Sequence, residues 1–276
     1  MLLTEKHIKQ FAVYYLTCFI LCYAWYFYYG LLFSSVNPVF FLNRLDVSHN
    51  IIMLTNLQNF LIQSRLLRII FDLLFLLLPV LLVYTVVKNK KGIRVIALAT
   101  CAFSIIYSSL FCSMSFVSVE VFAAAMLVPI IFCTISVKGF YYRMHCVRII
   151  FILMFFSSAL WKIRAGGIFN TEEMSAILLR QYASYLVSNS SDWFSNMITY
   201  LISHSTIACS LYLLAFIAEF IFVIGLFTRR FDRYLIISFC LFAVFDYLLM
   251  GINYFTWLPF LGCLYFSKYS IEKSGI

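Results

Sequence analysis

The segment IIFILMFFSSALWKIRAGGIFNTEE, residues 149–173, decides the fold class. No residue from Ile149 to Trp161 is charged, and the run then ends on Lys162 and two glycines. Longer charge-free runs cover 11–43 and 95–119, beyond the roughly 20 residues that a helix needs to cross a bilayer. The chain is 64% hydrophobic and 11% charged, which leaves too little polar surface to cover a soluble domain. We therefore expect a polytopic membrane protein.

The apolar runs are long and continuous, so they predict transmembrane helices and not the short alternating strands of a barrel. We expect an all-α transmembrane helical bundle that forms a single domain over 1–276. The stretch after Lys9 is too long for the apolar region of a signal peptide, so we expect a retained first helix. About eight spans are expected, near 11–33, 69–87, 94–113, 117–137, 147–163, 206–227, 232–250 and 253–267.

The basic residues predict the orientation of these spans. Most of the 20 Lys and Arg residues fall in short loops on one side of this threading, as cytoplasmic loops do. Both termini are then cytoplasmic, and the plasma (inner) membrane is the expected location. The net charge of +9 could suggest nucleic acid, but the basic residues lie in short clusters between apolar runs, so we expect no nucleic-acid partner. Two long segments, 34–64 and 164–205, face outside and are expected to lie in the membrane interface. They are either simple connectors or a roof over a cavity.

Five charged residues fall within or beside the expected spans, where charge is costly and usually faces a partner or a cavity. They are Asp72, Glu120, Lys162, Glu219 and Asp246. Most have an ordinary explanation: Asp72 can pair with Arg68 one turn away, Glu120 can begin a helix, and Lys162 can extend to the headgroups. Glu219 lies near the midplane and needs a partner, water or a proton.

Helix rise gives the depth of each charge. At 1.5 Å per residue, Lys162 lies about 21 Å from Arg148 and Asp246 about 20 Å from Arg233, while Glu219 lies about 6 Å lower. We therefore expect Lys162 to face the bundle and to pair with Glu219 or Asp246. His204 is expected to be a loop histidine with local partners.

Metal and thiol chemistry are not indicated. None of the nine cysteines stands in a CxxC pair, and no His/Cys spacing suits a metal, so we expect no metal site. Cys18 and Cys22 share one face of the first helix and are expected to be packing residues.

The stretch SSALWKIRAGGIFNTEEMSAILLRQ resembles part of the vitamin K-dependent γ-carboxylase-like HTTM (horizontally transferred transmembrane) family. In that family a small-residue stretch leads to a lysine, a short loop and another helix. The segments that follow are also similar to those of the family. They contain an acidic residue in an apolar helix, a basic turn and an aromatic-rich last span, so the likeness covers about 60–267. Its specific part is 157–180.

The resemblance implies that Lys162 is the base that deprotonates a quinol or another lipid-like substrate. If the alignment shifts by one position onto Trp161, no residue takes that role, and Trp161 is expected only to support the site. Glu219, Asp246, His204, Asp72 and Glu120 would support the site. The carboxylases have a large luminal domain that this chain lacks, so glutamate carboxylation is not implied. A lysine in a low-dielectric site loses its charge more easily, and the neutral amine can accept a proton from a phenol.

Three other functions stay open at this point. The chain could be a non-catalytic component for maturation or export of a small secreted peptide, with its outer segments as contact surface. It could be a redox partner similar to DoxX/MauE-type proteins, which would need thiols from elsewhere. It could be a transporter with Glu219 and Asp246 as proton relay, although it has no broken-helix repeats. Membrane lipids are partners in every case.

Overall fold

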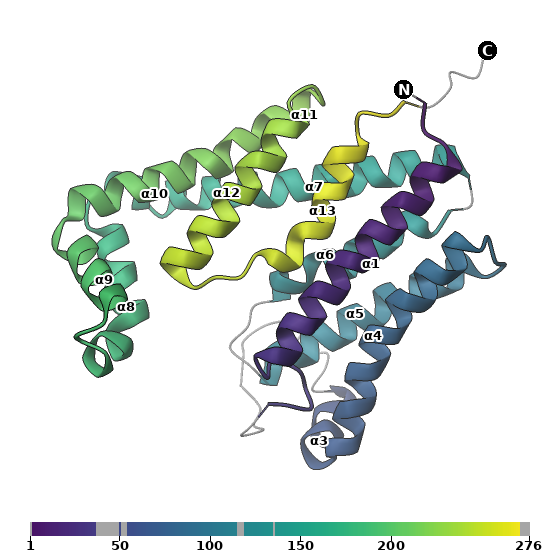
Figure 1. Ribbon diagram of the computed structural model, residues 1–276, viewed down its shortest axis with the longest axis horizontal. Coiled ribbons are helices and arrows are strands. Elements are labelled where there is room, and N and C mark those ends of the chain that lie inside the picture. Colours follow the sequence, from purple (N-terminus) through teal and green to yellow (C-terminus); the bar gives the residue numbers. More distant parts are fainter. Residues whose placement is uncertain (1, 37–49, 51–53, 115–118, 135, 271–276) are drawn as a thin grey trace. The chain divides into compact units, whose positions relative to one another are not determined.

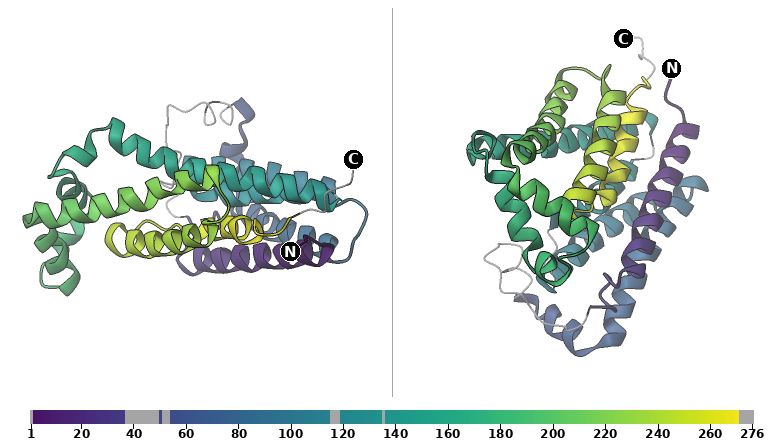
Figure 2. Two further views of the ribbon diagram at one scale, coloured as in Figure 1. Left: turned by 90° about the horizontal axis from the view of Figure 1, so that it is seen from above. Right: turned by 60° about the vertical axis from the view of Figure 1, so that its left-hand side comes forward.

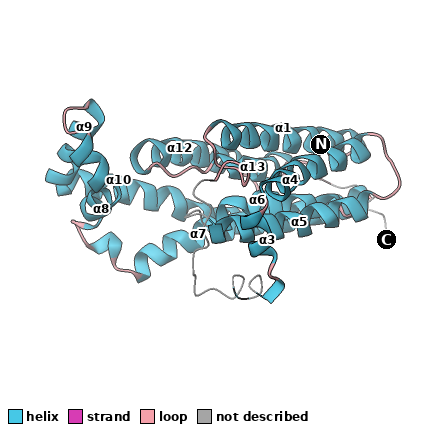
Figure 3. Ribbon diagram, turned by 90° about the horizontal axis from the view of Figure 1, so that it is seen from below, coloured by secondary structure: helices cyan, strands magenta, loops and turns pink. Residues whose placement is uncertain are grey.

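The computed structural model of the chain describes residues 2–36, 50, 54–114, 119–134 and 136–270. Within these residues the fold is helical, with an isolated bridge between Leu2 and Ser270 and no strand (Figure 3). Two compact units are distinguished, and each is described by itself. Unit 1 is Met1–Arg148 with Tyr254–Ile276, and unit 2 is Ile149–Asn253.

The helices of unit 1 include three of the long apolar segments. They are α1 (Glu5–Tyr28), α3 (Leu57–Gln63), α4 (Arg65–Val87), α5 (Ile93–Met114), η1 (Val119–Phe122), α6 (Ala123–Leu127), η2 (Val128–Phe132), η5 (Phe255–Trp257) and α13 (Leu258–Phe266). The helix α7 (Val137–Arg164) begins in unit 1 and ends in unit 2. α4 packs against α1 and α5, and α1 also packs against α13 (Figure 1).

The helices of unit 2 follow α7 in the chain. They are η3 (Gly167–Phe169), α8 (Glu173–Ser188), α9 (Trp193–Ser203), α10 (Ser205–Phe220), η4 (Ile221–Val223), α11 (Ile224–Phe227) and α12 (Asp232–Met250). The α8–α9 pair packs against α10, as both views of Figure 2 show.

Six helical segments of the described residues are long and apolar enough to cross a membrane. They are Glu5–Tyr28, Arg65–Val87, Ile93–Met114, Val137–Arg164, Ser205–Phe227 and Asp232–Met250. This confirms that the fold is all-helical within the described residues and that the chain has the apolar helices of an integral membrane protein.

The other two expected spans, 117–137 and 253–267, contain shorter apolar segments in the described residues, Ala123–Phe132 and Phe255–Phe266. Pro129 and Pro259 lie in the first turns of η2 and α13, where a missing backbone N–H is tolerated. The total of eight spans therefore stays a prediction. The expected interfacial segment 164–205 forms α8 and α9, whereas residues 37–49 and 51–53 of the other lie outside the described residues.

The core of unit 1 is aromatic and is organised around Tyr107. The Tyr107 ring stacks on Phe75 at 4.0 Å between centroids, and Phe33 meets it edge-on at 4.8 Å. Phe33 belongs to the segment after α1, where Gly30 takes a positive φ of 66° and turns the chain back. This turn brings the segment over α4.

Asp72 of α4 holds that segment in place. Its carboxylate accepts hydrogen bonds from the backbone N–H of Phe33 at 3.1 Å and of Ser34 at 2.8 Å, and from the Tyr107 hydroxyl at 2.7 Å. The sequence predicted an ion pair between Asp72 and Arg68, but Arg68 donates instead to the Val36 carbonyl at 3.4 Å. The expected i,i+4 ion pair does not form because the buried Asp72 carboxylate already accepts from two backbone N–H groups of the returning segment and from the Tyr107 hydroxyl of α5.

The core of unit 2 is also aromatic. Phe155 of α7 stacks on Phe222 at 4.5 Å and meets Phe239 of α12 edge-on at 5.4 Å. A Cβ on Gly225 would lie 2.7 Å from Ile152 Cδ1, so only glycine allows this close approach between α11 and α7. These contacts join α7 to η4, α11 and α12.

Asp72→Ala should lower the thermal stability of the purified protein strongly. The change leaves two buried donors, Phe33 N–H and the Tyr107 hydroxyl, and the half-buried Ser34 N–H without an acceptor, and each buried donor costs about 1–3 kcal/mol. Tyr107→Phe removes only one of the three bonds and should cost less, and Asp72→Asn should fall between them. Thermal unfolding in detergent provides the comparison, and an Asp72→Ala protein that melts with the wild type would refute this anchoring role.

Candidate functional site

The described part of unit 2 contains a charged pair between two apolar helices. Lys162 lies in the last turn of α7, and its Nζ is 2.7 Å from Oε2 of Glu219, near the end of α10. The Glu219 side chain is 4% exposed and that of Lys162 is 19% exposed. Lys162 was expected to pair with Glu219 or Asp246, and the structure pairs it with Glu219.

Ser158 completes the carboxylate environment. It lies one helical turn before Lys162 on the same face of α7, and its hydroxyl donates to Glu219 Oε1 at 3.1 Å. Each carboxylate oxygen therefore has its own donor. A buried charge is tolerated when it is both paired and hydrogen-bonded, and Glu219 meets both conditions.

The two glycines after Lys162 have different tasks. Gly166 takes a φ of +76°, which ends the helix and reverses the chain. Gly167 lies against Tyr212 of α10, because a Cβ there would be 2.7 Å from the Tyr212 hydroxyl and 3.4 Å from Cγ of Glu173. The loop can approach α10 this closely only because residue 167 has no side chain.

Tyr212 also lies beside the charged pair. The Lys162 Nζ is 5.5 Å from the centroid of its ring, within the range of a cation–π interaction. Tyr212 lies two turns before Glu219 on α10, so the same helix face supplies the carboxylate and the ring. The lysine is thus held by a carboxylate on one side and an aromatic ring on another.

Asp246 of α12 adds a second carboxylate near the pair. It is partly buried and lies within electrostatic range of both Lys162 and Glu219. Tyr182 of α8 lies near it, and burial together with the Asp246 charge raises the pKa of the Tyr182 hydroxyl. The predicted group of Lys162, Glu219 and Asp246 is therefore brought together, with Glu219 as the direct partner of the lysine.

The α8–α9 pair is attached to α10 and to the last residue of α12. Gln181 donates to the carbonyl of Met250, the last residue of α12. A small apolar core joins α8 and α9 to α10; its buried members are Met174, Leu178, Ile198, Leu201 and Ala208. The attachment at Met250 lies one turn after Asp246, and the apolar core meets α10 near its first turn.

The other predicted site residues lie elsewhere or have local roles. Trp161 is 62% exposed, and its ring is 5.1 Å from the Arg164 guanidinium, so it does not join the pair. His204 stacks on Tyr200 at 4.0 Å, and its Nδ1 lies 2.9 Å from the Tyr200 carbonyl, as a helix-junction histidine. Asp72 anchors the core of unit 1. Glu120 lies in η1 of unit 1, and its side chain lies outside the described residues.

Thiols and metal ligands are spread through the fold. The nine cysteines are free, and Cys22 donates to the Phe255 carbonyl at 3.3 Å. No group of three or more His, Cys, Asp or Glu residues is placed to hold a metal within the described part of the chain.

Two members of the charged site, Ser158 and Tyr212, were not predicted. Ser158 is four residues before Lys162 and Tyr212 is seven before Glu219, so helical periodicity around each charged residue could have found both. Comparison with known proteins adds no further member: no protein-family model, curated protein or solved structure matches the chain. The fold and site define a helical membrane protein in which a half-buried lysine pairs with a buried glutamate.

Gly167→Ala should destabilise the protein by about 1–3 kcal/mol, because the new methyl group would overlap the Tyr212 hydroxyl. In a Tyr212→Phe background the same change should cost much less, since the overlapping oxygen is gone. Thermal unfolding of the four proteins gives the comparison. Equal costs of Gly167→Ala in both backgrounds would show that the loop does not pack on Tyr212.

Proposed function

We propose that the chain is an HTTM-type integral membrane protein that binds an acidic, lipid-soluble substrate such as a quinol, with Lys162 as the base. The observation that carries the proposal is the contact between Lys162 Nζ and Glu219 Oε2 inside a group of apolar helices. Intramembrane ionisable residues usually mark functional sites, and a lysine can change its protonation state at such a site.

Glu219 can accept a proton from Lys162 and so leave the lysine as a neutral amine. A proton that moves from Lys162 Nζ to Glu219 Oε2 turns an ammonium–carboxylate pair into an amine and a carboxylic acid. In water this transfer is unfavourable, but desolvation penalises both charged groups and brings the two forms closer in free energy. Ser158 donates to the other oxygen and can stay in place in both forms.

The neutral amine would then take the proton of the substrate. The phenolic O–H bond breaks, an N–H bond forms on Lys162, and the products are an ammonium group and a phenolate. The two product charges attract each other in the low-dielectric site, so the lysine acts first as base and then as counter-ion. The Lys162 side chain remains 19% exposed, which leaves its amine accessible from one side.

The proposed membrane arrangement has eight spans in a plasma membrane, with both termini cytoplasmic. The six long apolar helices support most of it, and the short segments Ala123–Phe132 and Phe255–Phe266 would supply the remaining two. The basic loops support the orientation. In this arrangement α8 and α9 lie at the outer surface, and a quinol would reach Lys162 through the bilayer.

Menadiol, a naphthohydroquinone, is a suitable probe of the base. Under anaerobic conditions the purified wild-type protein should convert bound menadiol to its anion at a pH where free menadiol is neutral, which its absorbance spectrum reports. Lys162→Met removes the amine, and Lys162→Arg keeps the charge on a group that does not deprotonate. Both variants should bind menadiol without forming the anion.

Lys138→Met is the matched control, because Lys138 is an exposed lysine of the same helix α7. It should behave as the wild type. Anion formation that persists in both Lys162 variants would contradict the role of Lys162 as base and leave it as a structural partner of Glu219.

A further inference from the structure

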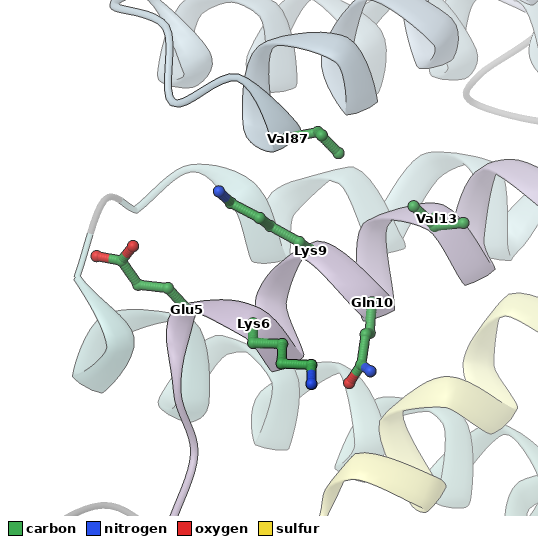
Figure 4. A pocket seen from close by; sticks show the side chains of 6 residues that line it. All are labelled: Glu5, Lys6, Lys9, Gln10, Val13 and Val87. Atoms are coloured by element: carbon green, nitrogen blue, oxygen red, sulfur yellow. The ribbon is translucent and has the colours of Figure 1, made fainter.

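Unit 1 has an open groove where α1 begins and α4 ends. Its volume is about 620 Å³, and it is lined by Glu5, Lys6, Lys9, Gln10, Val13 and Val87. In Figure 4 Lys9 extends from α1 toward the end of α4, while Lys6 and Gln10 extend to the other side of α1. The carboxylate of Glu5 points away from Lys6 and Gln10. The Lys9 ammonium therefore offers donors on the α4 side of the groove, and the Lys6 ammonium and the Gln10 amide offer donors on its opposite side.

The groove lies at the boundary between apolar and charged surface. α1 and α4 are both candidate membrane spans, and the groove lies at the first turns of one and the last residue of the other. Its apolar wall is formed by Val13, which is 52% exposed, and Val87. Beyond Val87 the chain continues into the exposed Lys88, Lys90 and Lys91.

We propose that this groove binds an anionic phospholipid, with the phosphate between Lys9 on the α4 side and Lys6 on the opposite side, and the first part of an acyl chain along Val13 and Val87. A ligand at this place must have a polar end level with the lysines and an apolar end level with the membrane. A phospholipid has both parts in that order. A soluble phosphate compound would match the lysines but would leave the valine wall in water.

The charges of the groove favour an anionic over a zwitterionic headgroup. Lys6 and Lys9 outnumber Glu5, and the three lysines that follow α4 add to the positive potential. Basic residues beside a membrane span attract anionic lipids through the same electrostatics. The site lies in unit 1 and does not involve Lys162, so it stands or fails independently of the proposed enzymatic function.

Native mass spectrometry of the purified protein, titrated with phosphatidylglycerol or phosphatidylcholine, tests the site. Phosphatidylglycerol should bind more tightly. Lys6→Gln or Lys9→Gln should each weaken its binding by about fivefold, and both together by about 25-fold, as expected for a lysine close to an anionic surface. Lys6→Arg with Lys9→Arg should keep the binding, which separates loss of charge from loss of folding.

Two controls distinguish a groove from general positive charge. Lys138→Gln removes an exposed lysine that does not line the groove and should leave binding unchanged. Glycerol phosphate, which has the phosphate without acyl chains, should not compete with phosphatidylglycerol. Equal weakening by Lys138→Gln, equal binding of phosphatidylcholine, or full competition by glycerol phosphate would each overturn the proposal.

Discussion

A lysine and a glutamate that face each other between apolar helices are the constraint on which unit 2 depends. Either charge alone would be costly in an apolar setting, because no opposite charge would compensate its lost hydration. Together, Lys162 and Glu219 fix the end of α7 against the end of α10. Ser158, Tyr212 and the glycine turn at 166–167 follow from that contact, since each fills a place next to the pair. The same ion pair contains a lysine that can exchange a proton with the Glu219 carboxylate.

Asp72 in unit 1 meets the same physical problem in a different way. It has no lysine within its described contacts and is held instead by two backbone N–H groups and a tyrosine hydroxyl. Such a carboxylate anchors a chain segment and has no adjacent group that can take up or release a proton readily. The difference explains why Lys162 and Glu219, and not Asp72, are the basis of the proposed chemistry.

Helical depth could be predicted from the sequence because the rise per residue is constant within a span. Counting from the flanking basic residues predicted that Lys162 lies near the depth of Glu219 and Asp246. In the structure Lys162 forms an ion pair with Glu219. The partners of Asp72 could not be predicted in this way. They come from a segment that turns back after Gly30, and its path depends on long-range aromatic packing of Phe33. The packing of Tyr212 on Gly167 likewise depends on a contact between two segments, which a single-span pattern does not contain.

A double-mutant cycle on Lys162 and Glu219 tests the central claim most directly. Lys162→Met leaves Glu219 buried without its partner and should lower the free energy of unfolding by about 3 kcal/mol. Glu219→Gln should be costly for the same reason, and the double variant should be more stable than Lys162→Met alone. Thermal unfolding of the four purified proteins gives the coupling between the two residues. Costs that simply add would contradict a direct pair between α7 and α10, and with it the arrangement of the site.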